Sequence, residues 1–189
     1  MRPNPSLEST RFVVLLRGVN VGKGNRVPMA EFKALLEGLG YQSVVTVLNS
    51  GNAVFSSAER SAAKHSLSIA AALEQSLGFG VATVVKSGAE FATVVAANPL
   101  TVPDSDHSRF LVAFAPDSTA LQGLQPLAQL AQLPERFVIG KKAAYLHCAN
   151  GILESKVGAA LLGKAGKSVT TRNWATVLKL VALSGASAA

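Results

Sequence analysis

Residues 11–25 have the sequence RFVVLLRGVNVGKGN, which joins a strand to a glycine-rich loop and decides the fold. Five consecutive apolar residues, 12–16, are typical of a strand that is buried on both faces and central in its sheet. The loop that follows is rich in glycine, asparagine and cations: Arg17, Gly18, Asn20, Gly22, Lys23, Gly24, Asn25 and then Arg26. Glycine allows positive φ and close approach to the backbone, so amides and cations can converge on one anion. A solvated loop whose glycines only satisfy turn geometry has the same composition.

The loop matches neither of two common phosphate-binding signatures. The spacing from Gly18 to Gly22 is one residue too short for a Walker A loop, and Gly24 stands where a Mg²⁺-binding Ser or Thr is needed. The G-x-G-x-x-G fingerprint of dinucleotide-binding folds is also absent. No Cys/His cluster has the spacing of metal ligands. We therefore make no prediction of NTPase activity or NAD binding, and we expect no cofactor and no metal.

Length and composition indicate a globular protein. The chain of 189 residues can bury a real core, and its apolar runs are far shorter than the roughly 18 residues that span a bilayer. We therefore expect no membrane partner. Residues 1–10 lack the apolar region of a secretory signal and are predicted to be a disordered extension. The single cysteine, Cys148, permits no internal disulfide, which agrees with a reducing cytoplasm.

The net charge of +7 is concentrated at the two ends of the sequence. Residues 1–30 contain five Arg or Lys and one acid, and residues 155–189 contain five and no acid. Residues 31–154 contain eight Arg or Lys against ten acids. If the fold brings the two ends together, they form one basic site for an anionic partner. If it keeps them apart, the charge only favours solubility.

The apolar pattern of residues 11–97 predicts a ferredoxin-like half. Strand and helix periodicities follow in the order strand, helix, strand, strand, helix, strand, helix. Residues 49–52, NSGN, form the turn of a hairpin between the second and third strands, and turn chemistry alone suffices to explain them. In this topology the third strand lies between the first and second. The loop at residues 17–25 and the hairpin should therefore be neighbours at one sheet edge.

The second part of the chain repeats this order of elements. Residues 98–108 are polar, contain two prolines and predict a linker. Residues 109–189 then predict the same succession of strands and helices, although nothing in them resembles the glycine-rich loop. The sequence therefore predicts an α+β protein of two ferredoxin-like halves, each an antiparallel sheet covered by helices, with one diverged functional half.

The last predicted helix has a polar entry, residues 170–174, TTRNW. Thr or Asn can cap free N–H groups there, and the positive end of the helix dipole adds to the charge of Arg172. Trp174 offers a stacking surface, but a Trp in the first turn of an amphipathic helix is more often part of the core. Lysines nearby, such as Lys156, suit a solvated face as well as a ligand.

Three strings, RGVNVGKGNRVPM, LNSGN and TTRNWATVLKL, occur in this order across nearly the whole chain after the extension. Together they resemble the bacterial family catalogued as domain of unknown function 1697. The resemblance implies two ferredoxin-like halves and no established activity. It also implies a set of motif positions: Arg17, Gly18, Asn20, Gly22, Asn25, Met29, Ser50, Gly51, Asn52, Ser155, Lys156, Thr171, Arg172, Asn173, Trp174 and Lys179. Two positions depart from the form expected of the family, with Asn49 in place of Gln and Ala175 in place of Asn.

Three classes of function compete. Binding of a nucleic acid or nucleotide is favoured by the basic ends and the Gly/Asn loop, although the strands lack the interleaved aromatics of an RNA-recognition sheet. An enzyme acting on a small phosphorylated or carboxylated metabolite is the alternative. The sequence offers such an enzyme no evident general acid or base, because the three histidines lie outside the motifs and no paired carboxylates accompany them. A structural scaffold, in which the motifs only hold turns, is the third class.

We predict one ligand site for a phosphate-bearing partner, whether nucleic acid, nucleotide or phosphorylated small molecule. Its residues are Arg17, Gly18, Asn20, Gly22, Lys23, Asn25, Arg26, Ser50, Gly51, Asn52, Lys156, Thr171, Arg172, Asn173 and Trp174. Within it, Asn52 is expected to shape the hairpin, and only Asn20 or Ser50 to face the ligand, because short amides in glycine-rich turns usually bond their own backbone.

Overall fold

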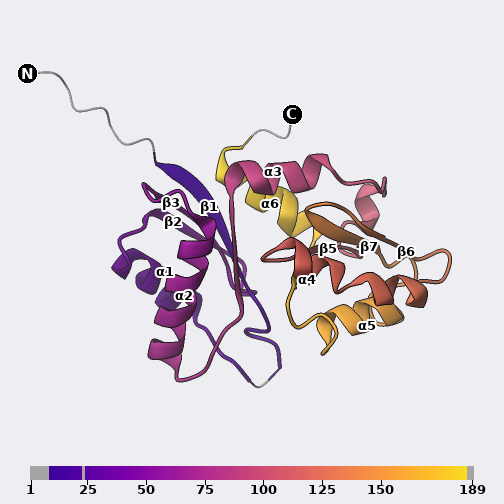
Figure 1. Cartoon of the computed structure of the whole chain (residues 1–189), viewed down its shortest axis with the longest axis horizontal. Coiled ribbons are helices and arrows are strands. Elements are labelled where there is room, and N and C mark those ends of the chain that lie inside the picture. The colour runs from indigo at the N-terminus through magenta and orange to yellow at the C-terminus, as the bar shows by residue number, and fades with distance from the viewer. Residues whose placement is uncertain (1–8, 23, 187–189) are drawn as a thin grey trace, which may run out of the picture.

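The computed structural model describes residues 9–22 and 24–186, which form two four-stranded antiparallel sheets covered by helices (Figure 1). Each sheet comes from one βαββαβ-like repeat, so the predicted fold class is confirmed. The first repeat consists of β1 (Thr10–Leu16), α1 (Met29–Gly38), β2 (Gln42–Val47), β3 (Asn52–Ser57), α2 (Ala62–Leu77) and β4 (Thr83–Ser87). The second consists of β5 (Phe110–Phe114), α4 (Ser118–Gln122), the 3-10 helix η2 (Gln125–Leu130), β6 (Arg136–Ile139), β7 (Ala143–His147), α5 (Lys156–Leu162) and β8 (Thr170–Asn173). One further helix follows each repeat, α3 (Gly88–Ala96) and α6 (Trp174–Ser184).

β1 lies inside the first sheet, whose strand order is β2-β3-β1-β4. It pairs antiparallel with both neighbours, so that Val13 faces Val54 on one side and Lys86 on the other. Residues 12–16 are all buried, as expected for a central strand. Because β3 runs antiparallel to both β1 and β2, the end of β1 and the β2–β3 hairpin meet at one edge of the sheet.

The second sheet repeats this order as β6-β7-β5-β8, with β5 in the place of β1. β5 is buried throughout and pairs antiparallel with β7 and β8. Val112 at its centre faces Tyr145 of β7 and Arg172 of β8. The order of elements therefore predicted the duplication correctly. Residues 170–173 of the C-terminal motif form β8, which is an edge strand of the second sheet.

Helices cover the outer face of each sheet. α1 buries Phe32 and Leu36, and α2 buries Ile69 and Leu73, which are pairs spaced four residues apart on one helix face. These side chains pack with Phe12 and its neighbours on the outer face of the first sheet. On the second sheet, α4, η2 and α5 contribute to the corresponding core.

α3 and α6 pack against the inner faces of the two sheets and join them in one core (Figure 1). Phe91 of α3 stacks on Phe114 of β5 with ring centroids 4.8 Å apart. Trp174 of α6 lies 5.0 Å from Phe110 by the same measure, and it is only 8% exposed. Because α6 also contacts β1 and β3, this last helix belongs to the core of both halves.

The predicted extension and linker lie at the boundaries of these repeats. Residues 1–8 of the extension are outside the described residues, whereas Thr10 already belongs to β1. Residues 98–108 contain the 3-10 helix η1 (Asp104–Asp106). Among the described helices, none is both long and apolar enough to cross a membrane.

Candidate functional site

The glycine-rich loop and the β2–β3 hairpin lie side by side, as the topology predicted. The main-chain N–H of Leu16 donates to the oxygen of Gly51 at 2.8 Å, and Asn20 Nδ2 donates to the oxygen of Asn49 at 2.7 Å. Gly51 has φ +74°, and a Cβ there would lie 2.7 Å from both Leu16 Cβ and Val19 Cγ2. Only glycine fits this position, because it combines a left-handed backbone with a close approach of β1.

Asn20 holds the glycine-rich loop closed. Its Nδ2 donates to the oxygen of Val27 at 2.8 Å as well as to Asn49, and its Oδ1 accepts the N–H of Val27 at 2.9 Å. Its own N–H donates to the oxygen of Asn25 at 3.1 Å. Asn tolerates the φ of +57° found here better than most residues. Both polar atoms of the Asn20 side chain are thus bonded to the backbone of the loop and the hairpin.

We expect Asn20→Ala to lower the free energy of unfolding by about 2 kcal/mol, because it removes three hydrogen bonds and places Ala at a left-handed φ. Urea denaturation of Asn20→Ala and Asn49→Ala checks this. The Asn49 side chain is exposed, and only its main-chain oxygen accepts from Asn20, so Asn49→Ala should change stability by less than about 0.5 kcal/mol. Equal effects of the two substitutions would contradict the role given to the Asn20 amide.

Arg172 projects from β8 into the edge of the first sheet and is 7% exposed. Its guanidinium donates to neutral oxygens from both halves. They are the main-chain oxygens of Leu16 (2.6 Å), Ser50 (2.9 Å) and Thr171 (2.7 Å), the Oγ1 of Thr170 (2.8 Å) and the Oδ1 of Asn52. A guanidinium has five N–H groups, so these contacts use its full donor capacity.

The charge of Arg172 is not neutralised by a carboxylate among the described residues, because all its acceptors are carbonyl, amide or hydroxyl oxygens. Burial lowers the pKa of Arg172 to about 10. Burying a charge is costly unless it is paired, and hydrogen bonds to neutral oxygens compensate only part of that cost. The site therefore keeps an excess of positive potential.

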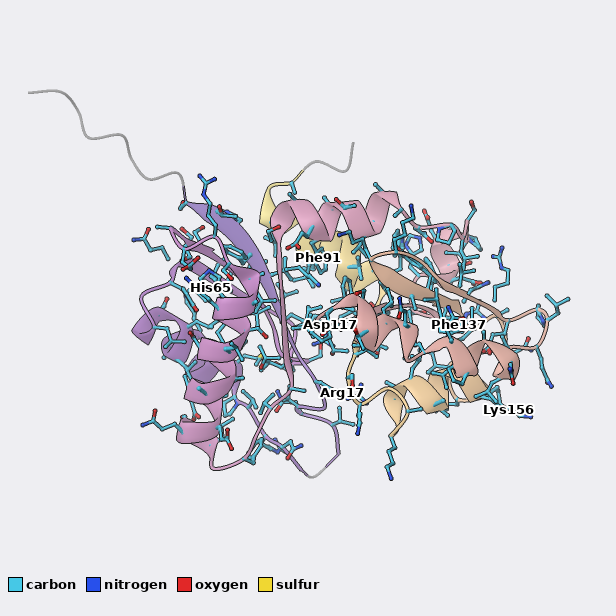
Figure 2. All side chains as sticks on the ribbon, viewed as in Figure 1. Arg17, His65, Phe91, Asp117, Phe137 and Lys156 are labelled. Atoms are coloured by element: carbon cyan, nitrogen blue, oxygen red, sulfur yellow. The ribbon has the colours of Figure 1, made fainter. Side chains whose placement is uncertain are left out.

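Arg17, at the end of β1, crosses in the opposite direction, from the first half to the second (Figure 2). Its Nη1 donates to the oxygen of Val169 at 2.6 Å, and its Nη2 donates to the oxygens of Leu162 and Gly163 at 3.1 and 3.0 Å. Leu162 ends α5, where free carbonyls and the helix dipole favour a cation. Arg17 is half-buried, and burial lowers its pKa.

Arg17 and Arg172 therefore form a reciprocal pair, which we call the arginine clasp. Each arginine comes from one half and donates to oxygens of the other. The Oγ1 of Thr170 adds a further contact to the oxygen of Leu16 at 3.3 Å. The clasp unites the N-terminal and C-terminal motifs and brings cations from the two basic ends of the chain together.

A cavity of about 360 Å³ lies beside the clasp, within the size range of small-molecule sites. Its lining residues come from both halves: Leu16, Arg17, Gly18, Val19, Val21, Ser50, Leu162, Thr170, Thr171 and Arg172. The lining residues combine aliphatic side chains, three hydroxyl-bearing residues and the two arginines of the clasp. None of these described lining residues is acidic.

The other predicted site residues have varied positions around this cavity. Asn52 is fully buried, and its Nδ2 donates to the oxygen of Val47 and to the Oγ of Ser50, both at 2.9 Å, so it shapes the hairpin. Asn173 is the N-cap of α6, and its Oδ1 accepts the N–H of Thr176. Gly22, Asn25 and Arg26 lie exposed on the loop. Lys23 lies outside the described residues.

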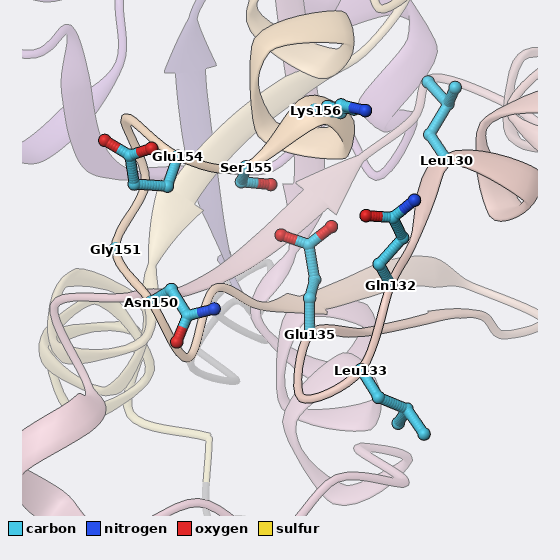
Figure 3. Close-up of a pocket in the computed structure, with 9 residues that line it drawn as sticks. All are labelled: Leu130, Gln132, Leu133, Glu135, Asn150, Gly151, Glu154, Ser155 and Lys156. Atoms are coloured by element: carbon cyan, nitrogen blue, oxygen red, sulfur yellow. The ribbon is translucent and has the colours of Figure 1, made fainter.

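Lys156 does not reach the clasp. It begins α5, about 10 Å along the helix from the end that Arg17 binds, and it lines a separate cavity of about 120 Å³ (Figure 3). Glu135 and Glu154 line the same cavity. Two carboxylates make this cavity unsuitable for an anion, so Lys156 lies in a different environment from the clasp. Trp174 also lies away from the clasp cavity, buried against Phe110 in the core.

A buried polar cluster in the second half was not recognised from the sequence. Asp106 Oδ2 lies 2.7 Å from His147 Nε2, and its other oxygen accepts from Arg109. The hydrogen bond from His147, with those from Arg109, lowers the pKa of Asp106. These contacts fasten residues 98–108 to β7. The spacing of three residues between Asp106 and Arg109 is the only sequence signal for the cluster.

A second cleft between the halves, about 520 Å³, was also not recognised. Lys86 of β4 lies in it and donates to the oxygen of Pro116 at 3.3 Å, and burial lowers its pKa. Glu90 and Asp117 line the same cleft. These two carboxylates offset the lysine, so the unbalanced positive charge belongs to the clasp cavity alone among these three cavities.

Comparison with known proteins supports the fold and supplies no ligand. A family model described as "Protein of unknown function (DUF1697)" matches residues 9–145. Among solved structures, the chain is similar to the conserved bacterial protein SP0830 from Streptococcus pneumoniae, with a TM-score of 0.76 and 24% sequence identity. The match covers 93% of this chain and 99% of that protein. The search of curated proteins gave no match.

Proposed function

Because this chain belongs to the DUF1697 family of proteins of unknown function, we propose a function from its geometry alone: it binds a small, phosphate-bearing anion in the clasp cavity. The carrying observation is that Arg17 and Arg172, both with lowered pKa values, donate only to neutral oxygens beside one cavity. An anion in this cavity would compensate both charges.

The electrostatic gain is large enough to matter. An anion about 6 Å from one guanidinium gains on the order of 3 kcal/mol at an effective dielectric constant of about 20. Two guanidinium groups act together, and apolar walls reduce screening by solvent. The hydroxyl-bearing residues Ser50 and Thr171 line the same cavity and can donate to an anion, whereas the hydroxyl of Thr170 already donates to the oxygen of Leu16. The desolvation of the anion opposes this gain, so we expect moderate affinity.

The geometry favours a small ligand over a nucleic acid. A polymer is bound mainly by cations that project towards its phosphates, whereas the N–H groups of Arg172 are buried and turned towards the protein. It also favours binding over catalysis. Among the described lining residues there is no His, Asp, Glu or Lys that could act as a general acid or base.

Thermal denaturation in sodium phosphate and in sodium chloride at equal ionic strength tests the proposal. At a phosphate concentration about 100 times the dissociation constant, we expect stabilisation of about 2.7 kcal/mol, or about 5–10 °C in Tm. For Arg17→Met, about ten times more phosphate should be needed to produce the same rise in Tm, where the rise is measured from the Tm of the variant without phosphate. Arg60→Met is the matched control, because Arg60 is exposed and follows the opposite end of β3. A rise in Tm in sodium chloride equal to that in sodium phosphate would refute a phosphate-specific site.

The clasp also supports a second candidate, a scaffold role without a ligand. The favouring observation is that Arg172 already uses all five N–H groups within the protein. In that case Arg17→Met lowers stability and phosphate has no specific effect on either protein. The same two measurements therefore separate the two candidates.

A further inference from the structure

The clasp cavity has an aliphatic entrance. Val21 and Leu162 line it and are 74% and 56% exposed, which leaves two branched apolar side chains in water beside the two arginines. Leu16 and Val19 continue the apolar surface inward and are buried. Val21 comes from the glycine-rich loop of the first half and Leu162 from the end of α5 in the second, so a ligand between them would be covered from both sides.

The cavity has no platform for a nucleobase among its described lining residues. Bases are usually held by stacking on aromatic side chains and by hydrogen bonds to their edges. No described lining residue is aromatic, and Trp174 is buried against Phe110. The two asparagines beside the cavity, Asn20 and Asn52, have amide groups engaged by the loop, the hairpin and Arg172.

We propose that the ligand of this cavity is an alkyl phosphate, with a phosphate headgroup and a short aliphatic chain. This inference rests on the proposed anion site and specifies its ligand class. The headgroup lies towards Arg17 and Arg172, and the alkyl chain contacts Val21 and Leu162 at the entrance. Charge complementarity at one end and aliphatic contact at the other fit an amphipathic molecule better than inorganic phosphate or a nucleotide.

Isothermal titration calorimetry with inorganic phosphate, methyl, butyl and hexyl phosphate, and adenosine monophosphate tests the proposal on the full chain. Affinity should rise with chain length, approaching about fourfold per fully buried methylene, and butyl phosphate should bind more tightly than the nucleotide. Pentanoate and heptanoate, titrated in parallel, show whether the headgroup is phosphate or carboxylate. Tighter binding of the alkyl phosphates than of the carboxylates of matched chain length supports the proposal, whereas the reverse order overturns the phosphate headgroup.

Substitutions at the entrance supply the matched variants. Val21→Ser and Leu162→Ser should each reduce the gain in affinity per methylene, whereas Leu133→Ser should leave it unchanged. Leu133 is 89% exposed and lines the separate cavity beside Lys156, so it controls for loss of an exposed leucine. Phosphate binding with equal affinity for all chain lengths, or tighter binding of the nucleotide than of hexyl phosphate, overturns this inference and leaves the anion site standing. Absence of binding by every anion overturns both.

Discussion

Arg172→Met should lower the free energy of unfolding by about 3–4 kcal/mol, which corresponds to a fall in Tm of roughly 6–15 °C. The substitution keeps an unbranched apolar stem but removes every hydrogen bond that the guanidinium makes. The main-chain oxygens of Leu16 and Ser50 and the Oδ1 of Asn52 would lose a donor in a buried place. Removal of the buried charge offsets part of this loss, which is why the expected value stays below the sum of the individual bonds.

Urea denaturation followed by circular dichroism measures this effect, and Arg60→Met is again the control. Arg60 is exposed on the turn before α2, so its substitution should stay within about 0.5 kcal/mol. Arg172→Lys distinguishes charge from geometry. Lys keeps the charge but has only three donors on one nitrogen, and we expect it to recover less than half of the loss. Wild-type stability of Arg172→Met would show that the clasp does not hold the two halves together.

Gly51→Ala should lower the free energy of unfolding by about 3 kcal/mol. The left-handed φ of +74° costs a residue with a Cβ about 1–2 kcal/mol, and the new methyl group would overlap Leu16 and Val19. Both of these residues line the clasp cavity. We therefore expect the phosphate-dependent rise in Tm to shrink as well, because the methyl group displaces the cavity wall.

Gly78→Ala separates the two causes of the Gly51→Ala effect. Gly78 is the C-cap of α2 with a nearly identical φ of +77°, and a Cβ there meets nothing within 4 Å. It should therefore cost only the backbone part, about 1 kcal/mol. If Gly51→Ala and Gly78→Ala lower the free energy of unfolding equally, the close approach of the hairpin to β1 adds nothing to the cost of a Cβ at position 51.

The fold could be predicted from sequence because each local signal agreed with the others. The apolar run at residues 12–16 predicted a central strand, and β1 has that place in the sheet. Ser87 and Glu90 have the S-x-x-E spacing of a capping box, and both hydrogen bonds of the box are present at the start of α3. The topology then placed the loop and the hairpin at one edge without any knowledge of long-range contacts.

The arrangement of the site depended on information that the sequence does not carry locally. The sequence predicted Arg17 and Arg172 as site residues but did not indicate what they contact. Their partners include main-chain oxygens, which every residue has, so no residue type marks them. Turn chemistry alone predicted that Asn52 shapes the hairpin. Asn20 shapes the glycine-rich loop in a similar way, through hydrogen bonds with the main chain of Val27, and this long loop closure was not predicted. The apolar lining by Val21 and Leu162 could not be predicted, because the two residues lie far apart in the sequence and line one cavity only in the folded chain.

The position of α6 has a consequence for synthesis of the chain on the ribosome. Among the described helices, α6 leaves the exit tunnel after all the others, yet it contacts β1 and β3, which emerge much earlier. Within the described part of the chain, α3 is the other helix that packs in this core, against Val13, Leu15 and Val54 on the inner face of the first sheet. We therefore expect the first sheet to bury its inner face fully only after α6 has emerged, and until then its transiently exposed apolar surface favours aggregation.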